Sequence, residues 1–157
     1  MSILIYLTLG LLTSLLFPPY FFLPLGFIIF PYLCLLLDSN RKNNSNSNIF
    51  KNFSLFGFGF FISYLLWVKN PFFVFEDTKN FFLAFLLLII LLSLILSLIF
   101  TIISKLGKNI PIILLVPFMF TISEYIISVF FYGFPWFTFS LVISSNEYLL
   151  FLSKYYK

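Results

Sequence analysis

Histidine is absent from this chain, and cysteine occurs once, as Cys34 inside an apolar run. These absences exclude histidine-based catalysis, histidine metal sites and intramolecular disulfides. A lone cysteine becomes a nucleophile only beside a cationic group, and the sequence around Cys34 offers none. We therefore expect no cofactor and no metal, and we interpret Cys34 as a core residue.

Charge is also scarce: 9% of the 157 residues are charged and 62% are hydrophobic. Soluble domains have about 25% charged residues, so this composition predicts an integral membrane protein. The sequence contains no dense basic patch or recognisable module that would support nucleic-acid binding. At about 20 residues per membrane helix, the length allows about five or six such helices and leaves no room for a sizeable soluble domain.

The apolar runs predict an all-α, polytopic membrane helix bundle in a single transmembrane domain over residues 1–157. Proline-rich turns and polar segments separate the runs. The polar segment 38–52, rich in Asn and Ser, is expected to be an exposed cytoplasmic loop. The apolar stretch 137–144 is too short to span and is expected to be interfacial, although insertion stays open. The five predicted helices lie near residues 3–17, 20–37, 53–68, 81–104 and 110–132.

Small residues in the first and third predicted helices indicate close helix contact. Gly10 and Ser14 are four residues apart, and Gly57, Gly59 and Ser63 lie on or near one side of their helix. Small side chains at this spacing let two helix backbones approach each other in a membrane. We expect both helices to pack through these residues.

The longest apolar helix carries a mild polar stripe of Ser93, Ser97 and Thr101, spaced four apart. In a helix, such hydroxyls can hydrogen-bond carbonyl oxygens of the preceding turn. We therefore interpret the stripe as a packing feature and expect these bonds to stay within the helix.

A carboxylate, Glu124, lies near the middle of the predicted helix 110–132. A charge inside hydrocarbon is costly, so it usually faces protein or water and marks a functional position. Thr121 and Ser128 share its face at helical spacing, and this stripe should face the bundle. We predict an intramembrane polar site here; a purely structural polar position is the alternative.

The sequence Gly-Phe-Pro-Trp, from Gly133 to Trp136, predicts the exit of this helix at a membrane surface. Glycine adopts conformations that other residues avoid, proline cannot continue the hydrogen-bond ladder, and tryptophan prefers the headgroup level. Trp67 similarly closes the helix 53–68. An aromatic belt with no further role would explain both tryptophans equally well.

Basic residues predict the orientation of the chain, because they favour the cytoplasmic side. If successive loops alternate sides, one side carries Arg41, Lys42, Lys51, Lys105 and Lys108. We expect that side and the N-terminus to be cytoplasmic. Both tryptophans then lie at the outer interface.

Three blocks of this sequence resemble the N-terminal membrane part of bacterial apolipoprotein N-acyltransferase. The first is LLTSLLFPPYFFLPLGFIIFPYLCLLL and the second is SLFGFGFFISYLLWV. The third, VPFMFTISEYIISVFFYGFPWFTFS, is the most specific because Glu124 precedes Gly-Phe-Pro-Trp in the family's order and spacing. The family commonly has an arginine where this chain has Ile127, so Glu124 lacks that local ion partner and either carries a proton or pairs with another helix.

The resemblance implies transfer of an acyl chain from a membrane phospholipid to the N-terminal amine of a lipoprotein precursor. In the family, Glu, Lys and Cys of a nitrilase-like domain perform this reaction, and the sequence stops at Lys157 before such a domain. No catalytic residue is carried over. The positions matching the family's outer interface, which are candidates for lipid contact, are Trp67, Phe134, Pro135 and Trp136.

The resulting expectation is a multi-pass module of the bacterial cytoplasmic (inner) membrane, truncated or split and inactive alone. Activity would require a separately encoded nitrilase-like catalytic subunit, and a lipoprotein precursor would be reached only through that subunit. Two alternatives are a small transporter or channel subunit that uses Glu124, and a degenerate gene product without function.

Overall fold

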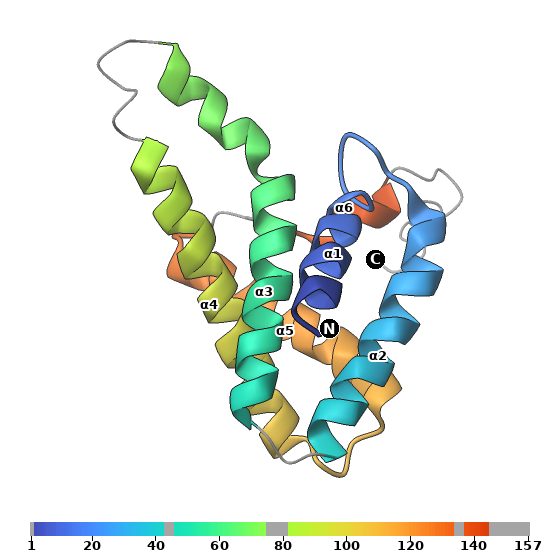
Figure 1. Cartoon of the computed structure of the whole chain (residues 1–157). Coiled ribbons are helices and arrows are strands. Elements are labelled where there is room, and N and C mark those ends of the chain that lie inside the picture. The colour runs from blue at the N-terminus through green and yellow to red at the C-terminus, as the bar shows by residue number, and fades with distance from the viewer. Residues whose placement is uncertain (1, 43–45, 75–81, 134–136, 145–157) are drawn as a thin grey trace.

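Helices form every regular element in the computed structural model, which describes residues 2–42, 46–74, 82–133 and 137–144. The predicted all-α fold is therefore confirmed for these residues (Figure 1). The elements, in chain order, are α1 (Ser2–Ser14), the 3-10 helix η1 (Leu23–Leu25), α2 (Gly26–Lys42), α3 (Asn46–Tyr64), the 3-10 helix η2 (Leu66–Phe73), α4 (Phe82–Leu106), α5 (Ile112–Phe130) and α6 (Phe139–Ser144).

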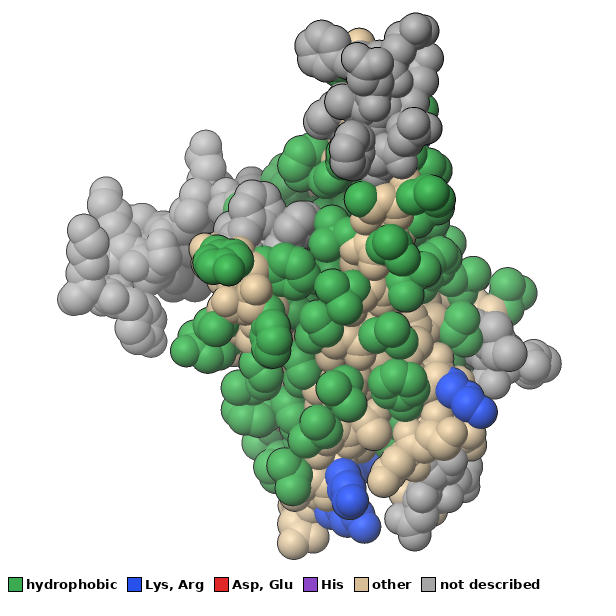
Figure 2. All heavy atoms as spheres, turned by 90° about the vertical axis from the view of Figure 1, so that its left-hand side faces the viewer, with side chains coloured by type: hydrophobic (Ala, Val, Ile, Leu, Met, Phe, Trp, Pro, Cys, Tyr) green, Lys and Arg blue, Asp and Glu red, His purple; other side chains and the backbone are tan. Residues whose placement is uncertain are grey.

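Within the described residues, three helical stretches are long and apolar enough to cross a membrane: Leu23–Lys42, Phe82–Leu106 and Ile112–Phe130. The helix Leu4–Ser14 is apolar but shorter. Figure 2 shows hydrophobic side chains over the middle of the face on the α4 side, with Lys and Arg side chains toward its lower end. Such an apolar surface is compatible with lipid and costly in water, so the fold is that of a membrane protein.

The polar segment 38–52 is helical where the structure describes it, so the predicted irregular loop is wrong there. α2 runs through the first five of these residues, and α3 begins before the segment ends. An ion pair at helical spacing, 2.6 Å between Lys42 Nζ and Asp38 Oδ2, supports the end of α2. Asn52 Nδ2 also donates a hydrogen bond to Asn40 Oδ1 at 3.4 Å, which links the two helices.

The turn between the first two long helices is longer than predicted. α1 ends at Ser14 rather than residue 17, and α2 begins at Gly26 rather than residue 20. Pro18 and Pro24 in this turn have no N–H to donate to a helical ladder. Phe17 still belongs to the core, because its side chain is fully buried.

α1 and α3 pack with their backbones in direct contact. A Cβ atom added to Gly10 would collide with the carbonyl oxygen of Phe56, and one added to Gly59 would collide with the carbonyl oxygen of Leu7. Each helix therefore has a glycine where its neighbour's backbone lies closest. The predicted contact through small residues is confirmed.

Two further small residues extend this packing. Ser14 Oγ donates a hydrogen bond to Ser63 Oγ at 2.7 Å, which joins α1 to α3. Gly57 does not share the side of Gly59 and Ser63, so that part of the prediction is wrong: a Cβ atom on Gly57 would lie 3.0 Å from Ser93 Cα of α4. α3 is thus held closely on two sides.

The hydroxyls of α4 follow the prediction at two of three positions. Ser93 Oγ donates to the carbonyl oxygen of Ile89 at 2.6 Å, and Thr101 Oγ1 donates to that of Ser97 at 2.8 Å. Ser97 Oγ instead donates to the carbonyl oxygen of Phe50 in α3. This bond crosses between helices because α3 and α4 lie so close together.

Phenylalanine side chains fill the space where the helices meet. Phe120 of α5 contacts Phe100 of α4 and Phe56 of α3, with ring centroids 5.0 and 6.1 Å apart and steep interplanar angles of 78° and 64°. Edge-to-face pairs of this kind are favourable beyond the burial of their surface. The fully buried phenylalanines of this core are Phe17, Phe53, Phe56, Phe61, Phe100 and Phe137.

The contact between α1 and α3 predicts that the substitution Gly10→Ala destabilises the bundle by about 1–3 kcal/mol, because the new methyl group forces two backbones apart. The measurement is an unfolding titration of the purified chain in detergent micelles. Gly26→Ala is the matched control, since its Cβ atom would meet only side-chain atoms at 3.6 Å or more. Equal stability of Gly10→Ala and the control would contradict the backbone contact.

Candidate functional site

Three residues predicted as an intramembrane polar site line one open cavity. Thr121, Glu124 and Ser128 of α5 form its wall together with Tyr125 and Thr138, around a volume of about 310 Å³. Helical spacing accounts for the three α5 residues, which lie on one face. The structure therefore brings the predicted polar residues together, and their functional role stays a prediction.

Glu124 is half-buried and joins α5 to the start of α6. Its Oε2 atom accepts a hydrogen bond from the backbone N–H of Phe139 at 3.2 Å. No ion pair to Glu124 occurs within the described part of the chain. The carboxylate thus acts there as an acceptor for a backbone donor from another helix.

The polar stripe lies at the edge of the bundle, so the prediction that it faces the interior holds only in part. Glu124 and Ser128 are half-buried, whereas Thr121 is exposed and its Oγ1 bonds to the carbonyl oxygen of Pro117 in the same helix at 3.1 Å. Larger apolar side chains occupy the buried face instead, because they fill the space between helices. That face consists of Leu115, Val116, Met119, Phe120, Ser123 and Ile127.

Ile127 occupies the position where the resemblance predicts an arginine, and its side chain is 1% exposed. An unpaired guanidinium at this buried apolar position would be costly. The isoleucine therefore fits the packing of this chain, and Glu124 takes its hydrogen bond from the Phe139 amide instead.

The exit of α5 agrees with the glycine signal in the sequence. Tyr132 and Gly133 adopt left-handed backbone conformations, with φ of 55° and 82°. The Gly133 N–H donates to the carbonyl oxygen of Ser128 at 2.8 Å, which is the pattern of a Schellman helix end. The predicted lipid-contact residues of this motif, Phe134, Pro135 and Trp136, lie outside the described residues.

Trp67 is on η2 rather than at the end of the third predicted helix. α3 ends at Tyr64, and η2 follows at Leu66, so the prediction of one helix over 53–68 is wrong at its C-terminal end. Pro71 within η2 cannot donate to an α-helical ladder, which is consistent with this change. The Trp67 side chain is 60% exposed, as lipid contact requires.

Residues 137–139 pack into the core, a role that no sequence pattern predicted. Phe137 is 1% exposed and its ring lies 5.6 Å from that of Phe61. Phe139 packs against Phe17 and Phe120, with ring centroids 5.2 and 4.9 Å apart. This short segment thus inserts aromatic side chains into the core, and interfacial hydropathy alone could not reveal it.

Comparison with known protein families identifies one match that covers nearly the whole chain. The family model for the apolipoprotein N-acyltransferase N-terminal domain matches residues 9–156. The chain belongs to this family. Comparison with curated proteins and with solved structures found no match.

The described residues of this apolipoprotein N-acyltransferase N-terminal domain contain no nucleophile with an activating base beside it. Cys34 is half-buried, and its Sγ atom lies 4.0 Å from the carbonyl oxygen of Ile112. A carbonyl is not a base that could activate a thiol by removing its proton. Residues 2–42, 46–74, 82–133 and 137–144 also contain no group of His, Cys, Asp and Glu that could hold a metal.

The contact between α5 and α6 predicts different results for two substitutions at Glu124. Glu124→Ala leaves the Phe139 amide without its acceptor, so we expect its hydrogen exchange to rise about fivefold, equivalent to a hydrogen bond of about 1 kcal/mol. Glu124→Gln keeps an acceptor oxygen and should change the rate little. Thr121→Ala is the control, because its bond stays within α5. Unchanged exchange in Glu124→Ala would contradict the contact.

Proposed function

We propose that these 157 residues are the membrane module for phospholipid-dependent N-acylation of lipoprotein precursors. The family match over residues 9–156 carries the proposal. The apolar helices Phe82–Leu106 and Ile112–Phe130 support it, since they suit a protein that works within a bilayer. In this role the module holds the site of reaction at the membrane and admits lipid acyl chains.

The module is proposed to be inactive alone. Acyl transfer through a thioester needs a thiolate, a nearby base and an oxyanion stabiliser. Cys34 has only a backbone carbonyl oxygen at 4.0 Å, and Glu124 is engaged with the Phe139 amide. Neither residue is arranged for this chemistry.

We assign the chemical step to a nitrilase-like catalytic subunit that lies outside these 157 residues. The lipoprotein precursor would bind through that subunit, and the phospholipid would contact this module. The proposed location is the bacterial inner membrane with a cytoplasmic N-terminus. Clustering of Arg41, Lys42, Lys105 and Lys108 around one cavity supports this orientation.

The division of labour predicts the outcome of expressing this chain in bacteria depleted of their own N-acyltransferase. Lipoproteins should keep a free N-terminal amine, because the module has no activated thiol. Mass spectrometry of lipoprotein N-terminal peptides measures the result. Co-expression of a nitrilase-like catalytic subunit from the same genome should restore N-acylation. The proposal would be contradicted if the chain alone N-acylated lipoproteins, or if co-expression with the catalytic subunit did not restore N-acylation.

Lipid contact at Trp67 predicts quenching of its fluorescence by brominated phospholipids. The chain has two tryptophans, so Trp136→Phe leaves Trp67 as the only emitter. In vesicles, bromines near the headgroup should quench it more strongly than bromines near the end of the acyl chain, because tryptophan prefers the interface. The double variant Trp67→Phe/Trp136→Phe, which has no tryptophan, is the control for background signal. Absence of quenching would exclude lipid contact at Trp67.

A further inference from the structure

A second, larger cavity lies where α2 and α4 end and α3 and α5 begin. Its volume is about 640 Å³, within the range of small-ligand sites. It lies at the N-terminal end of α5, whereas Glu124 and Gly133 lie toward the other end of that helix. The proposed acylation function does not use it.

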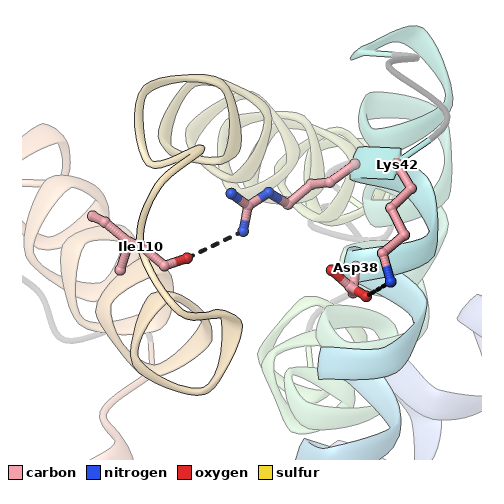
Figure 3. A network of polar contacts seen from close by, with 4 residues as sticks. Asp38, Lys42 and Ile110 are labelled. Carbon is pink, nitrogen blue, oxygen red and sulfur yellow. Dashed lines mark hydrogen bonds and ion pairs between the residues drawn. The ribbon is translucent and has the colours of Figure 1, made fainter.

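The charged side chains of this cavity are mostly basic. Arg41, Lys42, Lys105 and Lys108 line it, and Asp38 is the one carboxylate among its described lining residues. Asp38 is already paired with Lys42 at 2.6 Å, as Figure 3 shows. The cavity therefore has a net positive charge, which attracts anions.

Arg41 holds the wall of the cavity together. Its guanidinium donates hydrogen bonds to the carbonyl oxygens of Gly107 at 2.8 Å and of Lys108. It also donates to the carbonyl oxygen of Ile110 at 3.5 Å, the bond drawn in Figure 3. These carbonyls follow the C-terminus of α4, where a cation is favourable. Arg41 thus fixes the turn that carries Lys108, while the Lys105 and Lys108 ammonium groups have no ion pair within the described residues.

Two helix N-termini contribute to the same positive potential. Asn46, the first residue of α3, and Ile112, the first residue of α5, both line the cavity. The first turns of a helix have backbone N–H groups without partners inside the helix, and these groups favour negative charge. An anion here would meet both helix ends and lysine ammonium groups.

The buried hydroxyl of Ser104 provides an independent indication of a ligand. Ser104 lines the cavity and is 2% exposed, and its Oγ atom has no hydrogen-bond partner within the described part of the chain. Leaving a buried polar group without a partner is costly. The other two buried serine hydroxyls of α4 both have partners: Ser93 donates to the carbonyl oxygen of Ile89, and Ser97 donates to that of Phe50. Ser104 differs from them in having no such partner.

We propose that this cavity binds a phosphate-bearing anion, held by Lys105, Lys108 and the hydroxyl of Ser104. Phosphate oxygens accept several hydrogen bonds at once, which suits ammonium donors, a hydroxyl and helix N-termini. The phosphate can come from the headgroup of an anionic phospholipid or from free inorganic phosphate. Binding would stabilise the end of the bundle where four helices meet.

The test uses the full chain in detergent micelles and native mass spectrometry with phosphatidylglycerol, which is a net anion. Phosphatidylcholine, which is zwitterionic with no net charge, is the comparison lipid. The wild type should retain phosphatidylglycerol preferentially, and Lys105→Gln/Lys108→Gln should lower retention about tenfold by removing two charge-assisted contacts. Lys51→Gln/Lys69→Gln removes the same charge away from the cavity and should retain lipid as the wild type does. Ser104→Ala, a smaller change, should lower retention about threefold by removing one donor.

Inorganic phosphate distinguishes the two sources. If about 10 mM inorganic phosphate leaves the wild type's preferential retention of phosphatidylglycerol unchanged, the ligand is the lipid headgroup. A ³¹P signal of phosphate that broadens with the wild type and the Lys51/Lys69 control, but not with the Lys105/Lys108 variant, identifies free phosphate. The proposal would be overturned if the Lys105/Lys108 and Lys51/Lys69 variants retained equal amounts of lipid and broadened the phosphate signal equally. This holds whether both variants match the wild type or both fall below it.

Discussion

Direct contact between the backbones of α1 and α3 is the constraint on which the rest of the fold depends. In lipid there is no hydrophobic driving force between helices, so association depends on close packing and interhelical hydrogen bonds. Gly10 and Gly59 allow the approach, and the bond from Ser14 to Ser63 accompanies it. α3 then brings Gly57 against α4, and the phenylalanine core fills the space toward α5.

One cavity lies at the N-terminal end of α5 and the other along its middle and C-terminal half, and the two differ in chemistry. Toward the C-terminal end, Glu124 accepts a hydrogen bond from Phe139 and so connects α5 to the segment after the Gly-Phe-Pro-Trp motif. At the N-terminal end, Arg41 connects α2 to the turn between α4 and α5. Both contacts join a side chain to backbone groups of another segment, so each one fixes the chain's path near a helix end.

Sequence patterns predicted the helices and their close contacts well, because both depend on local composition. The apolar runs reveal which segments suit a bilayer, and Gly10 and Gly59 reveal where two backbones meet. The helical state of residues 38–42 and 46–52 was not predicted, since part of its support comes from tertiary contacts such as that between Asn40 and Asn52. For the same reason the spacing around Glu124 predicted its shared face but not which way that face points.

The proposed function requires that this membrane domain contains no acyl-transfer chemistry of its own. The sharpest measurement is the intact mass of the purified chain after incubation in vesicles whose phospholipids carry isotope-labelled acyl chains. We expect an unmodified mass, because the hydrogen-bond partner of the Cys34 thiol within the described residues is the Ile112 carbonyl oxygen, which cannot remove its proton. A labelled, hydroxylamine-sensitive acyl adduct that disappears in Cys34→Ser would show that the domain does react.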